Sequence, residues 1–381
     1  MQTGHDVINK SSLHIFRAEE RHRTRRLLVI SIAAFVLLFA FSMCLRTSQV
    51  DLISPVVAMQ NLFTWLKLVV AKWLDLPLYL ESEAIISKLP FYFETVARFK
   101  ISVITVVSGM MLALAGALYQ GVFRNPIAAP TMLGVASGIE LGILVMVLKY
   151  ANAAYSMTAK RYRYCYSFAL VILLIVMLTG KIASRGKKFA VTDMLLVGAA
   201  ISQIINVLIS YYRFEMEDEL LIVFQEISSG IYINIQTISF IILGVAFIVS
   251  VIPIHLLRYS FNAVCFSDDD AFTMGINPRI IRFIALICGT IMITAAMVHC
   301  GNVGMISLIV PHICRYLFGS DFKKIYYASG IFGGMLLLAC RDISGLFYFG
   351  YSGVLPIGSI VSMIAAPIFV IVLLQQRKGW E

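Results

Sequence analysis

The chain has 381 residues, of which 60% are hydrophobic and only 14% charged, and its formal net charge is +10. A soluble domain of this length could not hide so much apolar surface from water, so the composition predicts an all-α integral membrane protein. The positive charge fits membrane orientation and contact with anionic lipid headgroups. The sequence shows no combination of aromatic and basic residues that would suggest a nucleic-acid partner.

The chain begins with a basic tail, residues 1–26, without the small-residue cleavage site of a signal peptide. A bilayer core of roughly 30 Å requires about 20 mostly apolar residues per helix. Ten such runs follow the tail, and we predict them as transmembrane helices of a single domain over residues 27–381. The runs are residues 27–45, 101–122, 130–149, 165–183, 193–212, 236–257, 280–300, 303–318, 327–348 and 355–374.

Segment 55–74 is apolar but contains Gln60, Asn61, Lys67 and Lys72. We predict an amphipathic helix that lies on the external membrane surface. The alternative, an eleventh span, would place the termini on opposite sides. Both ends are basic, with Arg21–Arg26 at one and Arg377–Lys378 at the other, which favours an even number of spans and two cytoplasmic termini.

Catalytic motifs are absent from the sequence. It has no GxxxxGK[ST] phosphate loop, no HExxH and no GxSxG, and its seven cysteines include no CxxC pair. We therefore expect a chain that is not an enzyme and binds neither a metal nor a cofactor. Any nucleotide that powers it would bind to another polypeptide.

Residues 260–280 predict a short helix between two spans. Ser267 is a good N-cap, and the carboxylates of Asp268, Asp269 and Asp270 suit the first turn of a helix. After Ala271 and Met274, Gly275 fits a C-terminal stop, and Asn277-Pro278 can start the next helix. The segment is either a solvated acidic loop or a rigid element that transmits motion.

The turn Arg124-Asn125-Pro126 ends the second span, because proline lacks an amide hydrogen and cannot continue the helix. We expect Arg124 to contact lipid phosphate rather than an ATPase.

Small, amide, acidic and proline residues inside the spans are candidates for a transport pathway. Small residues can line a pathway or simply let helices pack closely. Glu140 lies well inside a span, where a carboxylate costs about 2.5 to 3.5 kcal/mol, so it either lines a pathway or is protonated and hydrogen-bonded. His312 is expected to be a packing residue, and Arg341-Asp342 to pair locally or to lie near the outer interface. The candidates are Gly109, Ala113, Gly116, Gln120, Glu140, Pro311, Pro356 and Gly358.

Five blocks resemble the FecCD-type ABC permeases, the importers of ferric siderophores, haem and cobalamin. They occur in the family's order. The blocks are residues 113–138 (ALAGALYQGVFRNPIAAPTMLGVASG), 195–199 (LLVGA), 268–276 (DDDAFTMGI), 301–319 (GNVGMISLIVPHICRYLFG) and 355–369 (LPIGSIVSMIAAPIF). Departures from the family pattern are Glu140, where a small apolar residue is usual, and the Arg341-Asp342 pair.

The resemblance implies a type II ABC importer permease with ten spans in the bacterial cytoplasmic membrane. It also implies a second permease subunit, identical or paralogous, two cytoplasmic ATPases that use ATP and Mg, and an external substrate-binding protein. Segment 260–280 would be the coupling segment. The sequence itself hints at an inverted repeat that relates spans two to five to spans seven to ten.

The first hypothesis is therefore a permease subunit that carries an iron-siderophore, or a haem- or cobalamin-like molecule, into the cytoplasm. The second is an ion-coupled secondary transporter that uses Glu140.

Overall fold

The computed structural model describes residues 10–45, 52–74, 85–150, 158–183, 191–230, 235–319, 321–346 and 355–377. Nearly all of this is helix. The first group of helices is α1 (Lys10–Cys44), α2 (Pro55–Trp73), α4 (Tyr92–Phe123), η2 (Pro130–Leu133), α5 (Val135–Tyr150), α6 (Thr158–Ala183), α7 (Val191–Glu215) and α8 (Asp218–Ser229). The second is α9 (Thr237–Leu256), α10 (Arg258–Phe266), α11 (Asp268–Thr273), α12 (Pro278–Cys300), α13 (Met305–Phe318), α14 (Phe322–Leu346) and α15 (Ile357–Arg377).

Each of the ten apolar runs falls on a helix: α1, α4, α5, α6, α7, α9, α12, α13, α14 and α15. Within the described residues, seven of these are long and apolar enough to cross a bilayer, whereas α13 and the apolar part of α15 are shorter. The helix α5 has 16 residues. The predicted class, an all-α membrane protein, is confirmed.

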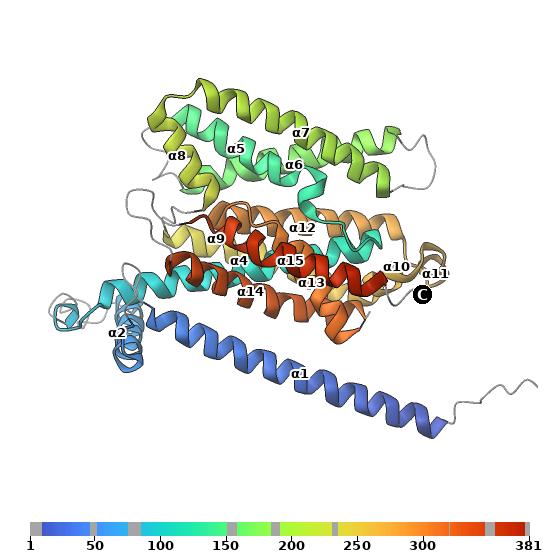
Figure 1. The fold of residues 1–381 in the computed structure, drawn as a ribbon, viewed down its shortest axis with the longest axis horizontal. Coiled ribbons are helices and arrows are strands. Elements are labelled where there is room, and N and C mark those ends of the chain that lie inside the picture. Colours follow the sequence, from blue (N-terminus) through green and yellow to red (C-terminus); the bar gives the residue numbers. More distant parts are fainter. Residues whose placement is uncertain are drawn as a thin grey trace, which may run out of the picture.

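The core is built around α4, which packs against α12, α13 and α14 (Figure 1). Its apolar window is 78% buried, the highest value among the candidate spans. Close approach depends on glycine: a Cβ on Gly109 would collide with the backbone oxygen of Gly333 in α14, and one on Gly116 with the backbone of Ser307 in α13. In the absence of water, such close packing between small residues is a main source of helix association.

A second group, α5, α6 and α7, packs together beside this core, with α8 against α5 (Figure 1). Among the described residues, α12 packs against α5 and α6, and hydrogen bonds between α6 and α12 help to join the groups. Tyr162 of α6 forms a hydrogen bond with His299 of α12, and the Tyr166 hydroxyl donates to the backbone oxygen of Ile291 at 3.2 Å.

Helix α1 lies at the perimeter, and only 17% of its apolar window is buried (Figure 1). It begins at Lys10, so the helix extends well into the tail predicted over residues 1–26. Near its C-terminal end, the backbone oxygen of Ser42 accepts a hydrogen bond from Arg98 Nε at 3.1 Å, and the Ser42 hydroxyl donates to Asp342 at 3.0 Å.

Arg98 also forms an ion pair with Asp342. The ion-pair and hydrogen-bond partners of Asp342 thus lie on α4 and α1, because α14 packs against both helices, and the neighbouring Arg341 adds a favourable charge. A place near the outer interface stays a prediction.

Helix α2 coincides with the predicted amphipathic segment 55–74. In Figure 1 it is seen nearly end-on while α1 and α4 run along the long axis, so it lies across their direction. Its exposed residues include Val56, Met59, Phe63, Leu66 and Trp73. The arrangement suits a helix in the plane of a membrane surface, which stays a prediction.

Candidate functional site

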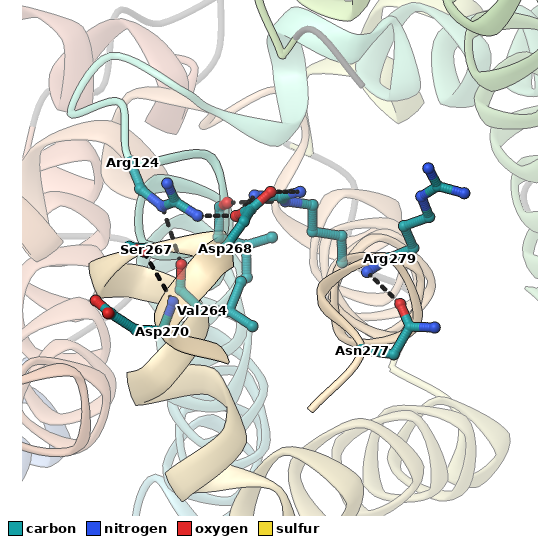
Figure 2. A network of polar contacts seen from close by, with 9 residues as sticks. Arg124, Val264, Ser267, Asp268, Asp270, Asn277 and Arg279 are labelled. Carbon is teal, nitrogen blue, oxygen red and sulfur yellow. Dashed lines mark hydrogen bonds and ion pairs between the residues drawn. The ribbon is translucent and has the colours of Figure 1, made fainter. Parts of the chain in front are cut away.

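Between α9 and α12 the chain forms two short helices, α10 and α11, where one short helix was expected. The Ser267 hydroxyl accepts a hydrogen bond from the backbone N–H of Asp270 at 3.0 Å, which caps α11 as the sequence predicts (Figure 2). Asp268, Asp269 and Asp270 fill its first turn, where the helix dipole favours negative charge.

The end of α11 is also closed by its own backbone. Gly275 adopts a φ of +73°, which is strained for any residue with a Cβ. This lets the Gly275 N–H donate to Phe272 O and the Ile276 N–H to Ala271 O, both at 2.9 Å. The Asn277 side chain then accepts from Arg279 N at 3.0 Å and caps α12. Both ends of α11 are therefore fixed.

Asp268 holds this segment to two other helices. Its carboxylate forms an ion pair with Arg124, at the end of α4, and accepts hydrogen bonds from Arg282 of α12 at 2.6 and 3.1 Å. Arg124 Nε in turn donates to the backbone oxygen of Val264 in α10 at 3.0 Å (Figure 2). One carboxylate therefore connects α11 to α4 and α12.

Burial alone would raise the pKa of the Asp268 carboxyl, but the hydrogen bonds and charges of Arg282 and Arg124 outweigh it and hold the pKa below its usual value. Asp268 is therefore ionised at neutral pH, and the three-residue ion cluster stays intact there.

Arg124 has protein partners that the sequence did not predict. It is the C-cap of α4, with a left-handed φ of 49°, and its guanidinium contacts Val264 and Asp268, while a contact with lipid phosphate stays a prediction. In the turn, Asn125 N donates to Gln120 O at 3.2 Å, and the Asn125 side chain accepts from Ile127 N at 3.0 Å. With Pro126, this gives the sharp reversal that the sequence predicts.

The sequence did not identify Arg282. Its position could be read from the sequence, because Arg282 lies one helical turn beyond the Asn277-Pro278 start of α12. A local pattern does not reveal that the turn between α11 and α12 brings Arg282 beside Asp268.

The other residues of α11, together with its C-cap Met274, divide between an inner and an outer face. Ala271 is fully buried, while Phe272 is 57% and Met274 67% exposed. These apolar side chains flank a polar, exposed first turn. A helix with fixed ends and exposed large apolar groups can serve as a contact surface for another protein.

The expected pathway residues on α4 lie inside the helix bundle. Gly109, Ala113 and Gly116 are buried and face α14 or α13. Gln120 is also buried, and its Nε2 donates to Leu308 O at 2.8 Å. This packing favours the helix-contact interpretation for the small residues, and a pathway role stays untested.

The remaining pathway candidates lie on other helices. Pro311 is buried in α13, beside His312, whose ring lies 6.0 Å from that of Phe369. Pro356 precedes α15, where a Cβ on Gly358 would come within 2.5 Å of Asn302 O. Glu140 of α5 lies beside Ser228 of α8, which hydrogen-bonds to it, and near the charge of Arg213.

Helix α7 carries a polar stripe that the sequence analysis missed. Gln203, Asn206 and Ser210 are all exposed, and their spacing of three and four residues places them on one face. By contrast, every exposed position over residues 29–41 of α1 and 238–252 of α9 is apolar. The surfaces of α1 and α9 suit lipid, whereas the stripe on α7 does not.

The described residues contain no group of three or more His, Cys, Asp or Glu side chains that could hold a metal ion.

Comparison with known proteins gives the family. The model of the FecCD transport family matches residues 63–375. The chain belongs to this family.

Two relatives illustrate the range of the FecCD family. The iron-uptake system permease protein FeuB of Bacillus subtilis is 28% identical over 72% of this chain and 78% of its own length. The hemin transport system permease protein HmuU of Yersinia pestis is 26% identical over 72% of this chain and 81% of its own.

Among solved structures, one described as the inward-facing conformation of a metal-chelate type ABC transporter matches with a TM-score of 0.70 at 18% identity. The match covers 92% of this chain and 99% of the other. The match shows that this chain has the same fold as that transporter chain. The family model confirms the resemblance to FecCD-type permeases that the sequence analysis found.

Proposed function

We propose that this chain is the membrane-spanning permease subunit of an ATP-binding-cassette importer that brings an iron chelate or a haem-like molecule into the cytoplasm. The observation that carries the proposal is the family match over residues 63–375. Relatives of nearly equal identity are named for iron uptake and for hemin transport, so the cargo class is iron-containing, with a siderophore as the first choice.

In this proposal, the conformational changes of the ATPase reach the permease through α11. Its caps fix both ends, and Asp268 joins it to α4 and α12, so a push on α11 moves these two core helices together. A separate ATPase that binds ATP and Mg would contact the exposed Phe272 and Met274. The coupling group is Ser267, Asp268, Asp269, Asp270, Ala271, Met274 and Gly275, and Arg124, Asn125 and Pro126 form the turn that receives Asp268.

The pathway lies between two permease copies. The polar stripe of α7 is unsuited to lipid, and Figure 1 places α7 at one edge of the molecule, where a second permease subunit, identical or paralogous, can face it. The complete assembly would contain two permease subunits, two cytoplasmic ATPases and an extracytoplasmic substrate-binding protein, in the bacterial cytoplasmic membrane with both termini inside.

The ion-coupled alternative depends on Glu140, which is the one acid well inside a predicted span. Its carboxylate has a protein partner, Ser228, and lies near Arg213. The surroundings of Glu140 fit a structural acid held between α5, α7 and α8, and the family match does not favour ion coupling.

Uptake of radioactive iron chelates into cells with and without this gene tests the proposal. We expect uptake to be lost on deletion, restored by the gene, abolished by ATP depletion with arsenate, and largely insensitive to a protonophore. Uptake that survives ATP depletion and collapses with the ion gradient would instead establish the secondary transporter.

A further inference from the structure

A cavity of about 290 Å³ lies beside the end of α4 that carries the Arg124 turn. Four parts of the fold enclose it: α4 with its turn, Cys265 of α10, Arg315 of α13, and Phe322 at the start of α14. The space is several times the roughly 30 Å³ that one water molecule occupies. It can therefore hold a small ligand.

The lining of the cavity is positively charged. It includes Arg124 and Arg315 and no acidic side chain. Arg124 shares the single carboxylate of Asp268 with Arg282, and Arg315 makes no hydrogen bond or ion pair with the described part of the chain. Burial raises the pKa of the Cys265 thiol to about 12, so this thiol is neutral and compensates neither arginine. The cavity therefore favours an anion.

Gln120 adds a second, independent requirement. Its side chain lines the cavity and is 1% exposed. Its Nε2 is used by Leu308, but its Oε1 is buried and accepts no hydrogen bond from the residues that the structure describes. A buried acceptor without a donor costs about 1 to 3 kcal/mol. Gln120 is one turn before Arg124, so both side chains can reach the same bound molecule.

We propose that this cavity binds a phosphate ester that carries a neighbouring hydroxyl group. The guanidinium groups of Arg124 and Arg315, from two different elements, hold the phosphate oxygens, because planar guanidinium donors match phosphate geometry. The hydroxyl donates to Gln120 Oε1. Two sources share this chemistry: the headgroup of an anionic phospholipid such as phosphatidylglycerol, and a soluble ester such as glycerol 3-phosphate.

Because Arg124 also pairs with Asp268, occupancy of the cavity is linked to the position of α11. A bound phosphate would compete with Asp268 of α11 for the guanidinium of Arg124.

The full chain in lipid nanodiscs tests the site. In phosphatidylcholine discs, thermal unfolding is followed as glycerol 3-phosphate is added. In discs that also contain phosphatidylglycerol, retained lipid is counted by native mass spectrometry. We expect at least one probe to bind, Arg315→Gln to weaken binding about tenfold or more, and Arg315→Lys to weaken it less. Gln120→Met should lower affinity by removing the acceptor for the hydroxyl.

Arg279→Gln is the matched control, since this exposed arginine of α12 is directed away from Asp268 (Figure 2). Stabilisation by glycerol 3-phosphate in phosphatidylcholine discs assigns the soluble source; retention of phosphatidylglycerol without that effect assigns the lipid. If neither probe binds, or if Arg279→Gln weakens binding as much as Arg315→Gln, the site is overturned. If Arg315→Gln does not fold, Arg315→Lys and Gln120→Met decide between these outcomes.

Discussion

Asp268 is the residue on which the site around α11 depends most. Its one carboxylate satisfies two arginines from different helices. Without the carboxylate charge, the guanidinium groups of Arg124 and Arg282 lie close together with no counter-charge from Asp268. Each hydrogen bond to a charged group contributes about 1.5 to 3 kcal/mol to stability. The low pKa of Asp268 also means that its contribution to stability is present at neutral pH and is lost as pH falls through that lowered value.

Asp268→Asn should therefore reduce ATP-driven uptake at least tenfold and lower thermal stability. Glu219→Gln removes a carboxylate charge from the exposed first turn of another helix, α8, which lies outside the coupling group, and it should transport normally. Uptake assays on both variants, normalised to the amount of protein in the membrane, separate the two effects. An Asp268→Asn variant that transports like the parent would contradict the role of the ion cluster.

For Glu140 we expect a substitution to have little effect on uptake. An ion-coupled carrier needs this acid to gain and lose a proton or to bind a cation, whereas a structural acid needs only its hydrogen bond with Ser228. Glu140→Gln can keep that hydrogen bond, so we expect uptake within about twofold of the parent. A large loss of uptake, with normal protein levels, would return Glu140 to the pathway.

At the scale of elements, α11 is six residues long and depends on its caps. The Met274 N–H donates to Asp270 O at 3.2 Å, so Met274→Pro removes this hydrogen bond and restrains Thr273. We expect loss of both uptake and stimulation of the ATPase, while Met274→Leu retains both. Uptake lost with stimulation unchanged would mean that α11 does not couple the two activities.

The contact between α4 and α13 gives a stability prediction. A Cβ on Gly116 collides with the Ser307 backbone, whereas a Cβ on Gly244 of α9 meets nothing within 4 Å. Gly116→Ala should lower stability by about 1 to 3 kcal/mol, as overpacked cores do, and Gly244→Ala should be neutral or slightly stabilising. Thermal unfolding in detergent measures both, and equal effects would refute the close-packing argument.

The helices were predictable because long apolar runs end at polar residues or prolines, as at Arg124-Asn125-Pro126 and Asn277-Pro278. The caps of α11 were predictable for the same reason: Ser267 and Gly275 act on their own neighbours. Asp342 and Arg98 were not, since they are separated by 244 residues and only packing brings them together. The spacing of Gln203, Asn206 and Ser210 places them on one face of a helix, which the sequence could have shown. Only the structure shows that these side chains are exposed and not covered by another described helix.

At the scale of the whole molecule, the two kinds of exposed surface predict different solvents. Asn206→Cys on α7 should react with a water-soluble thiol reagent, and Ile248→Cys on α9 should not, because the proposed function puts the polar stripe of α7 on a hydrated pathway and the apolar face of α9 in lipid. Both are compared in membranes that contain the assembled transporter, in a background with Cys44 and Cys265 replaced by serine. Equal reactivity would exclude α7 from the pathway.

The attachment of α1 has a consequence for how the protein is made. Ser42 and Arg98 are synthesised early, but their carboxylate partner, Asp342, is on a helix that emerges some 300 residues after Ser42. Until then Arg98 would have to remain hydrated at the membrane interface, since a cation without its counter-charge is costly in the bilayer. The contacts of α1 with α14 can therefore form only when translation is nearly complete, and nascent chains truncated before α14 should retain only the contacts of α1 with α2 and α4.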